Sequence, residues 1–257
     1  MICYTRNFED VLIQRAFTDI EQGFYVDVGA CLPVADSNPY GLYTSGWTGI
    51  AVEPNVSEEL LKMWRETRPG DVLLEKAVSN ESGVLEFHVF NAGQISTGSK
   101  VSVAHWKENG QEPTHVKTVE QITLNAIIEA QPNVTDWHLL CIDVEGMEYN
   151  VLQGLSWEAH RPWVVVLEAV WPGSPRPNLQ EWEPYLLSKG YVLAYFDTVN
   201  RYYVAQEHKE LLVHFQLTPN VWDNFRFTNE IVLEYQLGQA QEEIARLTAK
   251  QAELATV

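Results

Sequence analysis

The stretch that decides the fold spans residues 24–55 and reads FYVDVGACLPVADSNPYGLYTSGWTGIAVEPN. A short apolar strand runs into a tight turn at Gly29 and Ala30, and a second strand over residues 49–52 ends at Glu53. This layout is typical of an adenosine-binding site, because the glycine lets a ligand approach the backbone and the acid accepts hydrogen bonds from both ribose hydroxyls. The alternative interpretation is that Glu53 only caps the helix that follows.

The same turn argues against a nicotinamide cofactor. That class of site carries the pattern G-x-G-x-x-G, but Cys31 and Val34 occupy the second and third glycine positions after Gly29. Asp27, Gly29 and Glu53 remain as candidate cofactor-binding residues. Glu53 follows Gly29 by 24 residues (53 − 29), close to the roughly 20 expected of an acid that binds a ribose.

Composition sets limits on the class of protein. The chain has 257 residues, of which 46% are hydrophobic, which suits one large domain with or without an appendage. Its formal net charge is −18, from 17 basic and 35 acidic residues without a basic cluster, so we expect neither nucleic-acid binding nor attraction to anionic lipid. We also expect no insertion into a membrane, because no apolar run approaches the roughly 20 residues that span a bilayer.

The cysteine content favours a reducing compartment. Cys3, Cys31 and Cys141 cannot all pair within one chain, and none belongs to a CxxC motif. We therefore expect free thiols and a cytoplasmic protein.

The order of the elements predicts an α/β fold. Strands and helices alternate in the early chain, which favours a parallel sheet with helices on both faces, and residues 191–204 read as a hairpin that adds an antiparallel strand. Residues 72–79 are expected to form one strand. Residues 91–113 are expected to form a long irregular loop, which in a compact domain is usually functional or mobile.

Acidic residues follow two of the buried strands. Asp143 and Glu145 come directly after the strand at residues 137–142, and Glu168 ends the strand that begins at residue 163. Ligands bind open α/β sheets at the carboxyl edge of the strands, so these acids and Glu53 are expected to meet in one crevice. They could act as a general base, accept hydrogen bonds from substrate hydroxyls, or bind a divalent cation.

Two alternatives remain open for these acids. Asp143 or Glu145 could simply cap the following helix, a common role for acids at that place. His115 lies beside the irregular loop and is a further, weaker candidate for a general base.

The last segment differs from the rest of the chain. Apolar residues recur every seven residues at Leu233, Ala240, Leu247 and Leu254, and a second set follows at Leu237, Ile244 and Gln251. These spacings predict a coiled coil over about three heptads. The alternative is an amphipathic helix folded back on the domain. We expect a domain over residues 1–227 and a C-terminal helix over residues 228–257, which joins copies of the chain or binds a partner chain.

Several of these segments together resemble the FkbM-type S-adenosylmethionine-dependent methyltransferases. The segments are 24–30 (FYVDVGA), 47–55 (WTGIAVEPN), 77–83 (AVSNESG), 142–154 (IDVEGMEYNVLQG) and 161–168 (RPWVVVLE). Residues 7–17 (NFEDVLIQRAF), 199–204 (VNRYYV) and 219–225 (PNVWDNF) are similar to the bacterial, sugar-associated branch of the family.

The resemblance implies a class I methyltransferase fold, which is a Rossmann-like, seven-stranded sheet with an antiparallel last strand. It also implies O-methylation of a hydroxyl on a sugar, a surface polysaccharide or a small natural product. The implied cofactor contacts come from the turn at Asp27, Gly29 and Ala30, from Glu53 with Pro54, from Ala77 with Val78, and from Asp143. Our expectation for the chemistry is that Asp143 is the base and that Glu145 or Glu168 orients the acceptor. The competing interpretation is a partner domain that keeps the fold without the reaction.

Overall fold

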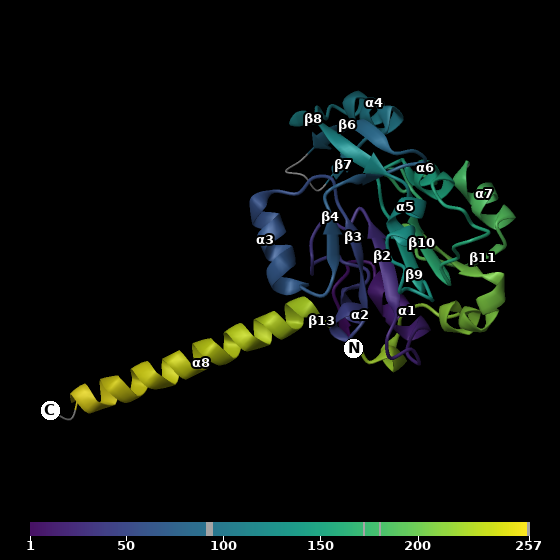
Figure 1. The fold of residues 1–257 in the computed structure, drawn as a ribbon. Coiled ribbons are helices and arrows are strands. Elements are labelled where there is room, and N and C mark those ends of the chain that lie inside the picture. The colour runs from purple at the N-terminus through teal and green to yellow at the C-terminus, as the bar shows by residue number, and fades with distance from the viewer. Residues whose placement is uncertain (91–94, 172, 180, 256–257) are drawn as a thin grey trace.

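The computed structural model describes residues 1–90, 95–171, 173–179 and 181–255, with side chains in the last helix up to Thr248 and at Gln251. An α/β domain forms the body of the molecule, and one long helix extends away from it (Figure 1). The predicted α/β class is therefore confirmed.

A seven-stranded mixed sheet lies at the centre of the body. Its strands, in spatial order, are β11 (Tyr191–Phe196), β12 (Asn200–Ala205), β10 (Val164–Glu168), β9 (Leu139–Ile142), β2 (Phe24–Val28), β3 (Thr48–Val52) and β4 (Val72–Leu74). Within this sheet β12 runs antiparallel to both of its neighbours, and the remaining pairs are parallel. The predicted hairpin at residues 191–204 is present as β11 and β12.

Both faces of this sheet are buried under helices. Alternate residues of β9 point to opposite faces, with Leu139 and Cys141 in one apolar cluster and Leu140 and Ile142 in another. The first cluster includes residues of α1 (Glu9–Ala16), α2 (Tyr40–Thr44) and the 3₁₀ segment η2 (Gln206–Phe215). The second includes residues of α5 (Leu124–Glu129), α6 (Glu148–Gln153) and α7 (Trp182–Ser188). Strands covered on both faces read as continuous apolar runs, as these do.

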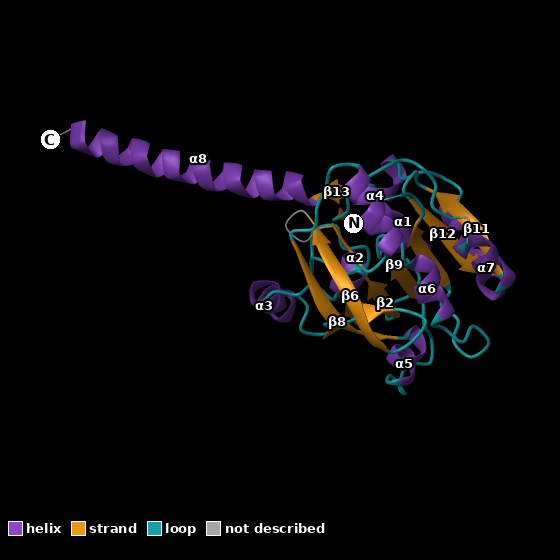
Figure 2. Cartoon of the chain, turned by 90° about the horizontal axis from the view of Figure 1, so that it is seen from above, coloured by secondary structure: helices purple, strands orange, loops and turns teal. Residues whose placement is uncertain are grey.

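A second, four-stranded sheet lies across one end of the central strands (Figures 1 and 2). It contains β5 (Ala77–Val78), β8 (His115–Ile122), β6 (Gly83–Phe90) and β7 (Ile95–Thr97). The predicted single strand at residues 72–79 is wrong. The chain turns after β4, where Lys76 N donates to Leu74 O at 2.9 Å, and β5 joins the second sheet.

The predicted irregular loop at residues 91–113 is also wrong over most of its described length. After β7 the chain forms α4 (Lys100–Glu108), whose first turn is capped by Ser99 Oγ, which accepts from Ser102 N at 3.2 Å. Trp106 and Val103 then pack on Phe90, so burial stabilises the helix. Residues 91–94 lie outside the described part of the chain.

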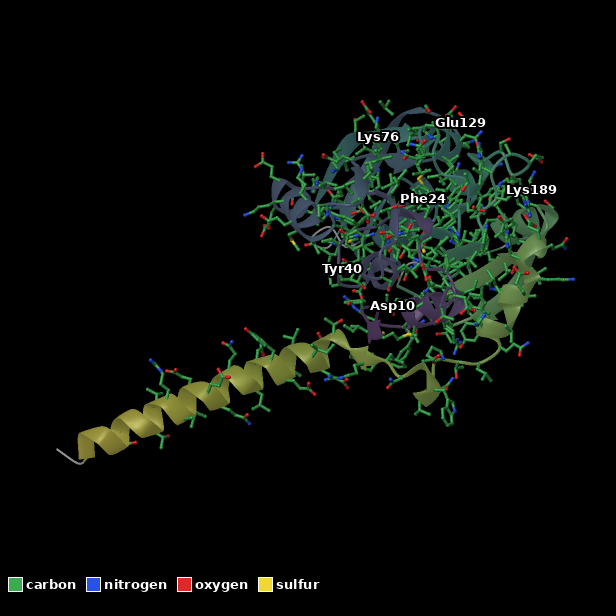
Figure 3. The ribbon with its side chains drawn as sticks, turned by 60° about the horizontal axis from the view of Figure 1, so that its bottom comes forward. Asp10, Phe24, Tyr40, Lys76, Glu129 and Lys189 are labelled. Carbon is green, nitrogen blue, oxygen red and sulfur yellow. The ribbon has the colours of Figure 1, made fainter. Side chains whose placement is uncertain are left out.

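The two ends of the domain meet. β1 (Ile2–Cys3) pairs in parallel with β13 (Arg226–Phe227), which follows the short 3₁₀ turn η3 (Val221–Asp223), and α8 (Thr228–Ala255) begins directly after β13. Figures 1 and 3 show α8 projecting from the body, with its drawn side chains in open space. The alternative of a helix folded back on the domain is therefore wrong. The side chain of Leu254, the last residue of the heptad pattern, lies outside the described residues. Among the described helices, none combines the length and apolar character needed to cross a bilayer.

A buried ion pair joins α3 (Glu58–Thr67) to the central sheet. Arg68 Nη2 and Asp71 Oδ2 are 2.6 Å apart, and both side chains are inaccessible to solvent. The guanidinium lies 4.5 Å from the ring centre of Trp64 in α3. Asp71 accepts hydrogen bonds from Gly49 N at 2.8 Å and from the Tyr25 hydroxyl at 2.6 Å, in β3 and β2 respectively.

We predict that Asp71→Asn lowers the free energy of unfolding by about 3–5 kcal/mol, because it leaves the Arg68 cation buried without its partner. The matched control is Glu66→Gln, which breaks the exposed Lys62–Glu66 pair and is expected to cost less than about 1 kcal/mol. Guanidinium unfolding curves of the two variants measure both values. Equal midpoints would contradict the role given to this ion pair.

Candidate functional site

A cavity opens where the carboxyl ends of the central strands meet the second sheet. Its lining comes from the ends of β2, β3 and β9 of the central sheet and from β5, β6 and the segment around β7 of the second sheet. It is lined by Val28, Gly29, Cys31, Val52, Glu53, Pro54, Lys76, Ala77, Val78, Leu85, Phe87, Ser96, Gly98, Asp143, Val144, Glu145 and Met147. An apolar cavity with a few convergent polar groups is the usual form of a small-molecule site.

Glu53 is fixed in the cavity wall by two backbone amides. Its Oε2 accepts from Cys31 N at 3.2 Å and its Oε1 accepts from Asn55 N at 2.7 Å. Burial raises the pKa of its carboxyl, and these two hydrogen bonds oppose that rise. The helix that follows is capped instead by Ser57, whose hydroxyl accepts from Leu60 N at 3.1 Å. The interpretation of Glu53 as a helix cap is therefore wrong.

The predicted cofactor residues are divided between the wall and the layer behind it. Gly29, Glu53, Pro54, Ala77, Val78 and Asp143 line the cavity. Asp27 and Ala30 are not among the lining residues. Ala30 packs with Ala51 and Trp64. Asp27 is buried, and its burial, opposed by the Arg68 charge and reinforced by Asp143, raises its pKa to about 7.

Gly29 is required by the backbone of the neighbouring strand. Its φ is +86°, in the region that favours glycine, and a Cβ built on it would lie 1.8 Å from the carbonyl oxygen of Asp143. The sequence suggested that this glycine makes room for a ligand. In the structure it also makes room for the end of β9, and so it brings Asp143 beside the β2 turn.

Three predicted catalytic acids meet at the ends of β9 and β10. Asp143, Glu145 and Glu168 each place one carboxylate oxygen within 4.8 Å of the others. The Asp143 side chain lines the cavity and is accessible to solvent. Protein atoms nevertheless surround its carboxyl closely enough for burial to be the main cause of its raised pKa. The pKa of all three carboxyls is raised, first by burial and then by neighbouring carboxylates. The predicted convergence with Glu53 on one crevice is confirmed for Asp143 and Glu145, which share the cavity wall with it.

Glu148 is a site residue that the sequence analysis missed. It is buried in the first turn of α6, where its Oε1 accepts from Gly146 N at 3.0 Å and from Val144 N at 3.3 Å. Glu148 therefore accepts the hydrogen bonds of the backbone amides in the turn between β9 and α6. Asp143 and Glu145 are not the caps of this helix. The available signal was an acid at the start of the helical run, three residues after Glu145, since acids are enriched in the first turn of helices.

His115 is not brought together with these acids. It lies at the exposed start of β8 and lines a neighbouring hollow together with Lys117 and Leu60, outside the wall of the main cavity. Its predicted role as an alternative base therefore has no support in the geometry, because a base must come within hydrogen-bond reach of the proton it removes.

Comparison with known proteins adds one match. A family model described as the methyltransferase FkbM domain matches residues 27–193, which is more than half of the chain. The matched region contains every residue that lines the main cavity. No curated protein matches the chain at a significant level.

We predict that Gly29→Ala lowers the free energy of unfolding well beyond the cost of its backbone conformation. The control is Gly46→Ala, which has a similar φ of +99° but meets no atom within 4 Å, so its expected cost is only about 1–2 kcal/mol. Guanidinium unfolding of both variants separates the steric conflict with Asp143 from the strain of a left-handed alanine. Equal costs would refute the close-packing argument.

Proposed function

The chain belongs to the FkbM methyltransferase family, and we propose that it transfers the methyl group of S-adenosylmethionine to a hydroxyl of a sugar or surface polysaccharide. One observation carries this proposal. The cavity wall with Gly29 and Glu53 lies at the same edge of the central sheet as the carboxylates that follow β9 and β10. A nucleoside cofactor bound at this wall would therefore lie next to a group able to take a proton. The strand order, with β12 antiparallel between β10 and β11, supports a class I, Rossmann-like methyltransferase fold.

The cofactor would lie along the wall formed by β2, β3 and β5. A carboxylate has about four acceptor positions, and backbone amides use one on each oxygen of Glu53. Glu53 lines the cavity, so its remaining acceptor positions would suit the two ribose hydroxyls. Ala77 and Val78, which line the cavity, would offer an apolar surface to the adenine, and the Gly29 turn would lie beside the methionine portion.

The chemistry requires alignment and one proton acceptor. The acceptor oxygen forms a bond to the methyl carbon while the bond from that carbon to sulfur breaks, and S-adenosylhomocysteine leaves as a neutral thioether. A sugar hydroxyl is a weak nucleophile, so its proton must pass to a base during transfer. We propose Asp143 as this base because its side chain lines the cavity, with Glu145 and Glu168 accepting hydrogen bonds from the acceptor. The three unpaired cysteines support a cytoplasmic location.

We also propose that α8 pairs with α8 of a second copy of the chain. Leu233, Leu237, Ile244 and Leu247 are exposed on this helix and recur at heptad positions. Residues of both charges flank them, including Glu243 and Arg246, which form an ion pair within the helix. A narrow apolar seam with charged flanks is the pattern of a coiled coil.

The catalytic proposal predicts that Asp143→Asn binds S-adenosylmethionine but transfers its methyl group about 10²–10⁴-fold more slowly, because the amide cannot take the proton. Calorimetric titration measures cofactor binding, and mass spectrometry of candidate glycans with labelled cofactor measures transfer. The matched control is Asp136→Asn, an exposed acid in the loop before β9. Absence of cofactor binding in the unaltered chain would instead identify a domain that has lost the reaction.

The pairing proposal predicts that Leu237→Asn combined with Ile244→Asn converts an oligomer to a single chain in sedimentation equilibrium. The matched control is Gln239→Asn combined with Glu242→Asn, which places two asparagines on the opposite side of the helix. A single-chain mass for the unaltered protein contradicts pairing with a second copy and directs attention to a different partner chain.

A further inference from the structure

The carboxylates at the ends of β9 and β10 form a cluster of negative charge without a matching cation. One oxygen each from Asp143, Glu145 and Glu168 lies within 4.8 Å of the other two. Among the described residues, no lysine, arginine or histidine forms an ion pair with any of the three. Carboxylates this close together repel one another, so the cluster either holds protons, in line with the raised pKa of all three carboxyls, or binds a cation.

Glu145 is directed into the cluster at a cost in backbone conformation. Its φ is +55°, in the left-handed region, and Gly146 follows at φ +101°. The hydroxyl of Thr97 donates to the Glu145 carbonyl oxygen at 2.8 Å, which holds this turn against the β7 segment. Such strained residues occur mainly at functional sites, where the rest of the structure determines them.

One oxygen of Glu145 provides a second, independent observation. Its Oε2 is buried and has no hydrogen-bond partner among the described residues. A buried polar atom without a partner costs about 1–3 kcal/mol, and more when the group is charged. A ligand that supplies positive charge at this point would remove that cost.

We propose that Asp143, Glu145 and Glu168 bind a divalent cation of the oxygen-preferring class, such as Mg²⁺ or Mn²⁺. The donor set consists of carboxylates alone, with no thiolate or imidazole, which is the set that hard cations prefer. Three protein oxygens leave coordination positions for water and for one hydroxyl of the acceptor. The formal charges then balance, since three carboxylates offset a divalent cation and the sulfonium of the cofactor.

The role of this cation in catalysis rests on the proposed function. Coordination lowers the pKa of the acceptor hydroxyl, as it does for metal-bound water. The hydroxyl proton passes to the oxygen of Asp143 that does not coordinate the cation. The hydroxyl oxygen bonds to the methyl carbon, and the bond from that carbon to sulfur breaks. The cation is neither oxidised nor reduced. The existence of the cation site does not depend on the proposed function, because it is argued from the positions of the three carboxylates.

The test is a titration of the full chain, freed of metal by chelator, with Mn²⁺ followed by electron paramagnetic resonance in 0.15 M salt. We expect one site per chain, displaced by excess Mg²⁺. Glu168→Gln should weaken Mn²⁺ binding at least tenfold while cofactor binding is retained, because Glu168 is absent from the cavity wall. The matched control is Glu81→Gln, an exposed acid in the turn before β6, which should bind Mn²⁺ as the unaltered chain does.

Each result has a separate meaning. No Mn²⁺ binding, or equal binding by Glu168→Gln and the unaltered chain, overturns the cation site and leaves the three acids to share protons. Calorimetry with S-adenosylmethionine on the same samples tests the proposed function separately, so a chain that binds Mn²⁺ but no cofactor retains the site and loses the function. If Glu168→Gln fails to fold by circular dichroism, Glu145→Gln takes its place with the same expected loss.

Discussion

The close contact between the β2 turn and the end of β9 is the constraint on which the site depends. The Asp143 carbonyl oxygen occupies space that a side chain at residue 29 would need. The same turn is tied to both neighbouring strands, since Gly29 N donates to Val52 O and Asp143 N donates to Val28 O, each at 2.9 Å. Three strand ends are therefore held in one small region, and every functional group that follows them is brought to the same cavity. Only glycine permits this contact, because it combines a positive φ with the absence of a Cβ.

This concentration of strand ends has an electrostatic consequence. Asp27, Glu53, Asp143, Glu145, Glu148 and Glu168 all lie near one edge of the sheet, and burial raises the pKa of each. The structure compensates these acids unequally. Backbone amides satisfy Glu53 and Glu148, which hold the turns around the site. Asp143, Glu145 and Glu168 receive no such compensation from the described residues, and this difference distinguishes them from the acids that hold the turns.

The second sheet converts an open edge into a cavity. Leu85 and Phe87 of β6 face the strand ends, and Thr97 at the end of β7 holds the Glu145 turn. The segment that the sequence left irregular is thus a packed unit, stabilised by Phe90, Val103 and Trp106. The second sheet also supplies Ala77 and Val78 of β5 to the cavity wall, so both sheets contribute to the proposed cofactor site.

The sequence by itself determined the central strands, the Gly29 turn and the acids at the strand ends, because buried strands appear as apolar runs and residues that follow parallel strands must share one edge. It could not show that Asp27 and Ala30 lie behind the wall, that His115 lies apart, or that Glu148 holds the turn, because these depend on the directions of side chains. It also missed the break between β4 and β5 and the helix α4, where packing against distant residues overrides local pattern. Only the tertiary structure decided that the Asp143 carbonyl occupies the space beside Gly29 and that α8 projects from the domain. Both facts depend on how segments far apart in the chain are placed relative to one another.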